Sequence, residues 1–169
     1  MRVSQEDAGA EAGLSGVGTL VSESGGRDPF SGSPDVAEAD YLAAQAFRTF
    51  TVQTTNSSGT LLIIQNFFLT GGSWETPPQA GAPINSGQTA SYNNLTEQAF
   101  TGLGGSMTLV PASGGSITLT WNWPWGGVAT GSATAASLNG ISVSATVINQ
   151  NTANPTLQVT VLNAPPPTS

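Results

Sequence analysis

Residues 141–161, ISVSATVINQNTANPTLQVTV, decide the fold class of this chain of 169 residues. Apolar side chains alternate with Ser and Thr over residues 141–148, and with Gln and Thr over residues 157–161. An alternation of period two is typical of a β-strand that buries one face. The segment between the runs, residues 149–155, is rich in Asn and contains a Pro. The stretch therefore predicts two strands joined by a turn.

The same period recurs in the preceding part of the chain. Apolar residues at 107–109 lead into the turn sequence PASGG, and the run ITLTWNW follows at residues 117–123, which predicts a hairpin. An alternating run also begins near residues 49–53, and weaker runs lie near residues 88–92 and 128–136. These segments predict further strands of the same domain.

Residues 61–69, LLIIQNFFL, are apolar at consecutive positions, which predicts a central strand covered on both faces. The sequence NSSG at residues 56–59 predicts a turn before it. From these registers we expect the following side chains to be mostly buried: Leu61, Ile63, Phe67, Leu109, Leu119, Trp121, Val143, Val147, Val159 and Val161.

Residues 47–163 thus hold about eight expected strands with no helical crossover between them, which excludes parallel βαβ folds. We predict an all-β domain, an antiparallel β-sandwich or single jelly roll. Residues 164–169 are rich in Pro and predict a stiff C-terminal tail.

The N-terminal part has a different composition. Residues 1–32 consist mainly of Gly, Ser, Ala and acidic residues, which predicts an extended acidic arm. Residues 33–46 begin with Ser33 and Pro34, a pair that favours a helix start, so we expect one short helix there.

Charge is divided unequally along the chain. Eight of the ten carboxylates and all three Arg lie in residues 1–48, and only Glu75 and Glu97 follow. A nearly uncharged domain surface favours association with copies of the chain or with partners. The lack of a basic patch argues against direct nucleic-acid binding. No apolar run is long enough to span a bilayer, and residues 1–7 lack the apolar core of a signal peptide.

Composition also argues against catalysis. The chain has no Cys, His or Lys, so a Ser nucleophile would lack its usual base. Glu75 and Glu97 form the one alternative, a glycosidase-like carboxylate pair, which we consider the weaker interpretation. We therefore expect that the chain is not an enzyme and that it has no cofactor and no metal site. We interpret Gly104-Gly105 and Gly114-Gly115 as turns, and the glycosylation patterns at Asn56 and Asn94 as chance matches.

The densest motif is WNWPWGG at residues 121–127. One interpretation makes Trp121 and Trp123 core residues and Trp125 a lid over the end of the sandwich. The other makes the segment an exposed aromatic surface that binds a sugar, lipid headgroups or a partner subunit. The candidate interaction residues in the domain are Trp74, Trp121, Trp123 and Trp125.

This motif and the hairpin before it, GGSMTL at 104–109 and LTWNWPWG at 119–126, resemble aegerolysins. Members of that family are small acidic β-sandwich proteins with an aromatic-Trp-Asp/Asn-Cys-Pro-Trp-Gly segment. Trp123 stands where the family has Cys, and the charged loops are missing. The resemblance implies lipid binding at membranes, often beside a pore-forming partner protein.

The overall plan is also similar to the small single jelly-roll capsid proteins of tailless, membrane-containing bacteriophages. On that resemblance we predict a structural virion protein, a capsid or decoration subunit located in the virion. It would assemble with its own copies and with another capsid protein through its sandwich faces and its arm. The arm contacts would come from Leu14, Val17, Leu20, Val21 and Phe30. The alternative is an aegerolysin-like sandwich that binds lipid or glycan at membranes, either cytoplasmic or secreted by a non-standard route.

Overall fold

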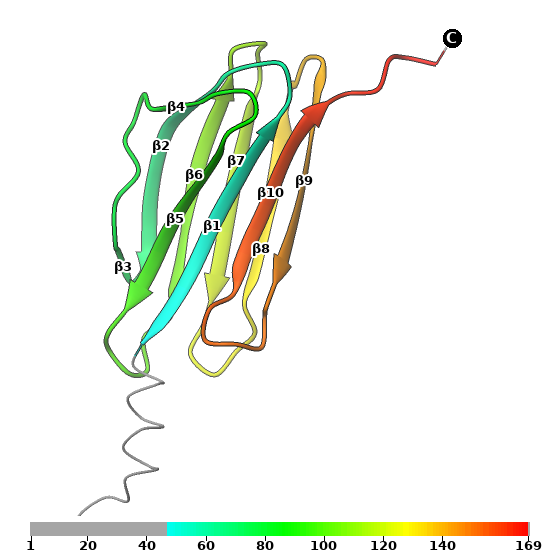
Figure 1. The fold of residues 1–169 in the computed structure, drawn as a ribbon. Helices are drawn as coiled ribbons and strands as arrows, with labels where there is room; N and C mark the ends of the chain where they lie inside the picture. The colour runs from blue at the N-terminus through cyan, green and yellow to red at the C-terminus, as the bar shows by residue number, and fades with distance from the viewer. Residues whose placement is uncertain (1–46, 169) are drawn as a thin grey trace, which may run out of the picture. The chain divides into compact units, whose positions relative to one another are not determined.

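The computed structural model describes residues 47–168, which form a sandwich of two five-stranded sheets (Figure 1). The first sheet has the order β3-β5-β1-β10-β9, and the second has the order β4-β2-β6-β7-β8. The strands are β1 Arg48–Ser57, β2 Leu62–Gly71, β3 Ser73–Trp74, β4 Pro83–Ile84, β5 Thr89–Thr96, β6 Leu103–Pro111, β7 Ser116–Trp123, β8 Thr130–Ala136, β9 Ile141–Ile148 and β10 Thr156–Asn163. The predicted all-β sandwich is confirmed.

Ten strands replace the expected eight because β3 and β4 have only two residues each, too short for an alternating pattern to be recognised. The predicted arm, residues 1–32 with its five apolar contact residues, and the predicted helix, residues 33–46, lie outside the described residues. Within the described residues, no helix is long and apolar enough to cross a membrane.

Local pairings agree with the sequence pattern. The predicted hairpin is formed by β6 and β7, where Met107 pairs with Leu119 and Leu109 pairs with Ile117. Residues 141–161 contain β9 and most of β10, which pair antiparallel. The exception to antiparallel pairing is β1 with β10, which run parallel. This pair joins strands about a hundred residues apart, and no local pattern predicts its direction.

The core lies between the two sheets. Of the predicted core side chains, Leu109, Leu119, Trp121, Val159 and Val161 are buried, and Phe67, Val143 and Val147 are partly buried and pack against them. The register predicted for residues 61–64 is wrong. Leu62 and Ile64 are the buried residues, each 0% exposed, whereas Leu61 and Ile63 are half-buried. Because the sandwich has two layers, β2 is covered on one face only.

A β-bulge in β2 explains why its sequence looks apolar on both faces. The register with β6 shifts between Ile64 and Asn66, so one residue is inserted into the strand. Beyond the bulge, Phe67 and Leu69 pack against the core, while Phe68 is 57% exposed. A single phase of alternation therefore cannot describe this strand.

The prediction that Gly104-Gly105 forms a turn is also wrong. Both residues lie inside β6, where Gly105 pairs with Trp121 of β7. A Cβ atom on Gly105 would lie 2.6 Å from the Phe68 carbonyl oxygen and 2.6 Å from Cζ2 of Trp121. Glycine is therefore needed for close packing against the indole. Gly114 and Gly115, by contrast, form the predicted turn, with φ of 110° and 85°.

The register of β2 can be tested by removing one methylene group at a time. Ile64→Val should lower the free energy of unfolding by about 1 kcal/mol, because it leaves a small cavity in a close-packed core. Ile63→Val should lower it by less than about 0.5 kcal/mol, because that side chain lies on the outer face. Urea denaturation followed by tryptophan fluorescence measures both. Equal losses would contradict this assignment of the two faces.

Candidate functional site

The loops at one end of the sandwich form the candidate site. Residues 97–102 join β5 to β6, residues 124–129 join β7 to β8, and residues 149–155 join β9 to β10. Figure 1 shows these three loops together at the lower end of the sandwich, where β1 also begins. We call this region the loop end, and it comprises Phe47, Arg48 and the three loops.

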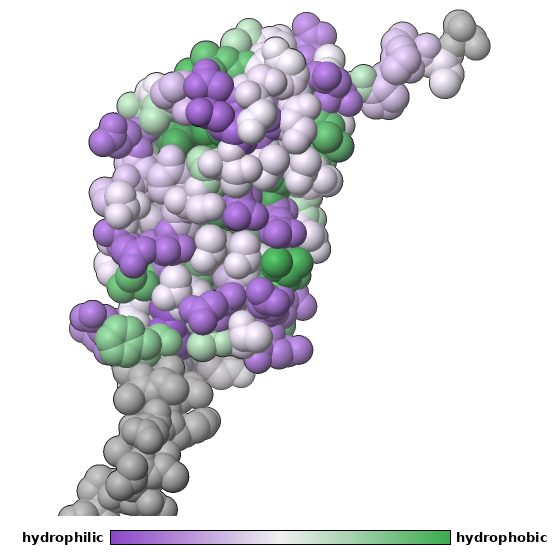
Figure 2. All heavy atoms as spheres, viewed as in Figure 1, coloured by the Kyte–Doolittle hydropathy of each residue, from purple (hydrophilic) through white to green (hydrophobic). Residues whose placement is uncertain are grey.

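Exposed apolar side chains are concentrated at the loop end. Phe47 is 65% exposed, Phe100 72% and Val128 57%, and Ile148 borders the third loop. The remaining exposed large apolar residues between positions 47 and 168 are Phe68 of β2, which is 57% exposed, and Leu162 at the opposite end. On the face shown in Figure 2, hydrophobic residues form small patches among hydrophilic and near-neutral ones. A concentration of exposed aromatic and aliphatic groups marks an interaction surface.

Phe100 is held in an exposed position by its own loop. Its φ of 64° lies in the left-handed region, which is unfavourable for an aromatic residue. Its ring contacts Trp125 edge to face, with centroids 4.9 Å apart. The loop begins with a hydrogen bond in which the backbone N–H of Gln98 donates to Oγ1 of Thr96. Strained backbone together with an exposed ring is a pattern found at functional sites.

Arg48 connects two of the loops by hydrogen bonds to their backbone carbonyls. Its guanidinium donates hydrogen bonds to the carbonyl oxygens of Thr101, at 2.9 Å, and Pro124, at 3.3 Å. Its Cζ atom lies 3.6 Å from the ring centroid of Trp123 and 5.3 Å from that of Trp125. The side chain is buried, and the loss of surrounding water lowers the pKa of Arg48 from its ordinary value. Arg48 is the one basic residue between positions 47 and 168.

The four tryptophans have different surroundings. Trp121 and Trp123 are buried, and their indole N–H groups donate to Oδ1 of Asn94 and to the carbonyl of Gly127. Trp125 is partly exposed in the 124–129 loop. Trp74 is half-buried and contacts Phe67, Tyr92 and Trp121. Trp121 and Trp123 therefore pack inside the domain, and of the WNWPW motif it is Trp125 that reaches the loop end.

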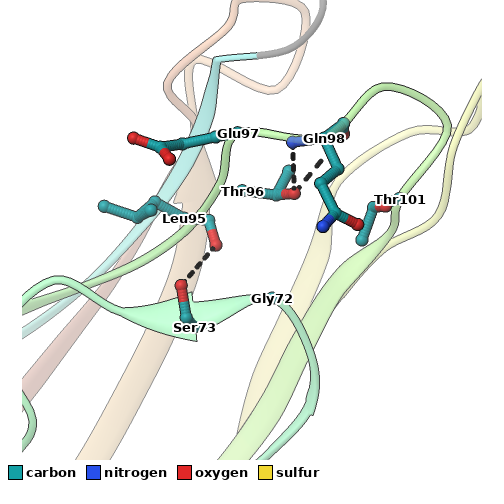
Figure 3. A pocket seen from close by; sticks show the side chains of 7 residues that line it. All are labelled: Gly72, Ser73, Leu95, Thr96, Glu97, Gln98 and Thr101. Carbon is teal, nitrogen blue, oxygen red and sulfur yellow. Dashed lines mark hydrogen bonds between the residues drawn. The ribbon is translucent and has the colours of Figure 1, made fainter.

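Two hollows lie on either side of the Phe100 loop. The first, of about 320 Å³, is shown in Figure 3 and is lined by Gly72, Ser73, Leu95, Thr96, Glu97, Gln98 and Thr101. The second, of about 420 Å³, is lined by Thr70, Gly71, Phe100, Thr101, Gly102, Leu103, Asn122, Pro124 and Trp125. The first is lined mainly by hydroxyl, amide and carboxylate groups, and the second includes two aromatic rings. Thr101 belongs to both.

Sequence reasoning identified Trp125 but missed the rest of the loop end. Phe47, Arg48, Phe100 and Val128 lie in separate segments, and no alternating pattern relates them. Asn94 was interpreted only as a chance glycosylation match. It is instead 0% exposed, as is Asn56, so neither side chain is accessible for modification in this fold.

The two acidic residues between positions 47 and 168 have different surroundings. Glu75 accepts a hydrogen bond from Nδ2 of Asn93, whereas Glu97 lines the first hollow. Among residues 47–168, no group of three or more His, Cys, Asp or Glu side chains is placed to hold a metal ion. The expectation that the chain is not an enzyme stays a prediction.

Solved structures of β-sandwich proteins are similar to this chain. The lipid binding protein Nakanori superposes with a TM-score of 0.60 at 12% sequence identity, over 74% of this chain and 74% of that chain. The Xerocomus chrysenteron lectin XCL superposes with a TM-score of 0.47 at 10% identity, over 68% of this chain and 99% of that chain. No protein-family model and no curated protein matches the sequence.

The likeness to Nakanori confirms the sandwich fold, and at this identity it shows the fold alone. The aegerolysin resemblance implied a β-sandwich, and that part of the expectation is confirmed. The resemblance to phage capsid proteins gains no support from these structures.

Proposed function

We propose that the chain is a non-catalytic binding domain that attaches to the surface of a lipid membrane through its loop end. The observation that carries the proposal is the exposure of Phe47, Phe100 and Val128 at one end of the sandwich, where Phe100 also contacts Trp125. These side chains come from three separate segments and are held away from the core. Aromatic rings on exposed loops are favoured at the boundary between lipid headgroups and acyl chains.

The sparse charge of the domain supports the same proposal. Within residues 47–168, the ionised side chains are Arg48, Glu75 and Glu97, and Arg48 is buried. Two of these three residues lie at the loop end, and because Arg48 is buried, Glu97 is the exposed charge there that has to stay hydrated in the headgroup layer. Each large apolar side chain that is fully removed from water contributes about 1.5–3 kcal/mol. Three such groups, partly inserted, contribute less than about 9 kcal/mol together, which favours weak and reversible attachment.

Net charge indicates which lipids are favoured. The chain carries a formal net charge of −7, and the lone cation of the described domain is buried between two tryptophans. Anionic headgroups would be repelled and would meet no exposed basic group on the domain. Neutral or zwitterionic lipid surfaces therefore suit the loop end better. A lipid binding protein, Nakanori, has the same fold, which supports the proposed binding to lipid but says nothing of headgroup charge.

The proposal is tested by vesicle co-sedimentation of the full chain with phosphatidylcholine vesicles. A triple variant in which Phe47, Phe100 and Val128 are each replaced by Ser should bind vesicles at least about tenfold more weakly, because most of the inserted apolar area is lost. Leu162→Ser is the matched control, since Leu162 is 45% exposed at the opposite end of the sandwich. It should bind as the unaltered chain does, and far-UV circular dichroism should be the same for all three proteins.

Two outcomes would contradict the proposal. Equal binding by the unaltered chain and the triple variant would remove the loop end from the contact. Absence of vesicle binding, together with large self-assembled particles in size-exclusion chromatography, would favour the coat-protein prediction.

A further inference from the structure

The first hollow has a lining suited to hydroxyl-rich ligands. Glu97, Gln98 and Thr101 form no side-chain hydrogen bonds to other described residues, so their polar groups are available at its wall. Figure 3 shows the Gln98 amide on the Thr101 side and the Glu97 carboxylate extending the other way. Gln98 and Thr101 together offer an amide donor, an amide acceptor and a hydroxyl on one side of the hollow, and the Glu97 carboxylate is an acceptor on the other side. Each sugar hydroxyl both donates and accepts, so this mixed set matches adjacent hydroxyls.

The charge of this hollow argues against phosphate and other anions. Glu97 is the ionisable residue in its lining, and no basic residue lines it. The nearby guanidinium of Arg48 is directed to the carbonyl oxygens of Thr101 and Pro124. The Thr101 carbonyl is thereby occupied, whereas its hydroxyl remains available. An anionic group would therefore meet a carboxylate with no compensating cation.

A quaternary ammonium group fits the loop end less well than a sugar. Such cations are bound by the open faces of several aromatic rings. Here the face of Trp123 is covered by Arg48 at 3.6 Å, and Trp125 is in contact with Phe100. Both Phe100 and Trp125 line the second hollow, whereas no aromatic residue lines the first. The hydroxyl and amide groups around Glu97 instead favour a neutral polyhydroxylated ligand.

From this lining and charge we infer that the first hollow binds a neutral sugar headgroup, while the aromatic loop beside it contacts the apolar part of the same lipid. The inference rests on the proposed membrane attachment. A volume of about 320 Å³ lies near the lower limit of about 300 Å³ for ligand pockets, which suits a single sugar ring. Thr101 borders both hollows. The sugar of a glycosylated lipid in the first hollow would therefore lie next to the aromatic lining of the second.

The test compares vesicles of phosphatidylcholine alone with vesicles that also contain a neutral monoglycosyl ceramide. The full chain should bind the glycosylated vesicles about tenfold more tightly, the gain expected from two or three hydrogen bonds. Gln98→Ala combined with Thr101→Val should lose this gain, measured for each protein as the ratio of its affinity for glycosylated vesicles to its affinity for plain vesicles. Gln79→Ala combined with Thr134→Val is the matched control on exposed residues outside the hollow, and it should keep the gain. Glu97→Gln, which preserves shape, should lose part of the gain.

A free methyl glycoside distinguishes a sugar site from a site that requires the whole lipid. Competition by the glycoside for glycosylated vesicles, with no effect on plain vesicles, is expected. Equal affinity for plain and glycosylated vesicles would overturn the sugar inference and leave membrane attachment standing. A gain that survives in Gln98→Ala/Thr101→Val would also overturn it, because the sugar would then bind elsewhere. Failure to bind any vesicle would overturn the proposed function itself.

Discussion

Asn94→Leu is expected to lower the free energy of unfolding by about 3–5 kcal/mol, although leucine has the same branching at Cγ. The Asn94 side chain is 0% exposed. Its Nδ2 donates to the carbonyl oxygens of Gly71, at 3.0 Å, and Ser73, at 3.4 Å, and its Oδ1 accepts from Nε1 of Trp121 at 3.0 Å. Leucine would leave the buried Trp121 N–H and the partly buried carbonyls of Gly71 and Ser73 without these partners. A buried polar group that loses its hydrogen bond costs about 1–3 kcal/mol.

Urea denaturation of Asn94→Leu measures this loss, with Asn122→Leu as the control. Asn122 also lies in a strand, but its side chain is exposed, so the control should change stability by less than about 0.5 kcal/mol. A double-mutant cycle with Trp121→Phe, which removes the indole N–H, should show non-additive losses because the two residues share a hydrogen bond. Additive losses, or a small loss for Asn94→Leu, would show that the network adds little.

Arg48→Met is expected to lower the free energy of unfolding by about 2–4 kcal/mol. Methionine can fill much of the same space, but it has no charge to place over Trp123 and no N–H to bond the Thr101 and Pro124 carbonyls. The loops at residues 97–102 and 124–129 would lose the hydrogen bonds that connect both of them to residue 48. We therefore also expect weaker vesicle binding, because Phe100 and Trp125 lie on these loops.

Thermal and chemical denaturation of Arg48→Met, with Arg48→Lys as comparison, measures the effect. Lysine keeps the charge but lacks the planar group that bonds two carbonyls at once, so an intermediate loss is expected. Unchanged stability of Arg48→Met would mean that the cost of burying the charge equals the energy of its contacts.

Local patterns in the sequence were sufficient for several features of the fold. The alternation at residues 141–148 and 157–161 predicted β9 and β10, and the PASGG turn predicted the β6–β7 hairpin. Such features could be predicted because strand period and turn chemistry depend on neighbouring residues. The acidic arm and the helix before the domain stay predictions, since they lie outside the described residues.

Other features were decided only by the tertiary structure. The sequence LLII offered two registers, and the choice of Leu62 and Ile64 as core residues follows from the bulge after Ile64. Gly104-Gly105 resembled a turn because its need for close packing against Trp121 arises from the neighbouring strands. Glycine content and apolar runs do not specify which surface each strand will meet.

The candidate site shows the same division. The WNWPW motif by itself determined that this region is aromatic and that the strand ends near Pro124. Only the pairing of β1 with β5 and β10 placed Arg48 beside two of the loops, where it bonds Thr101 and Pro124, 53 and 76 positions away in the sequence. The physical reason is that a loop end is assembled from the tips of non-neighbouring strands. Its composition is fixed by strand order, which no local sequence pattern encodes.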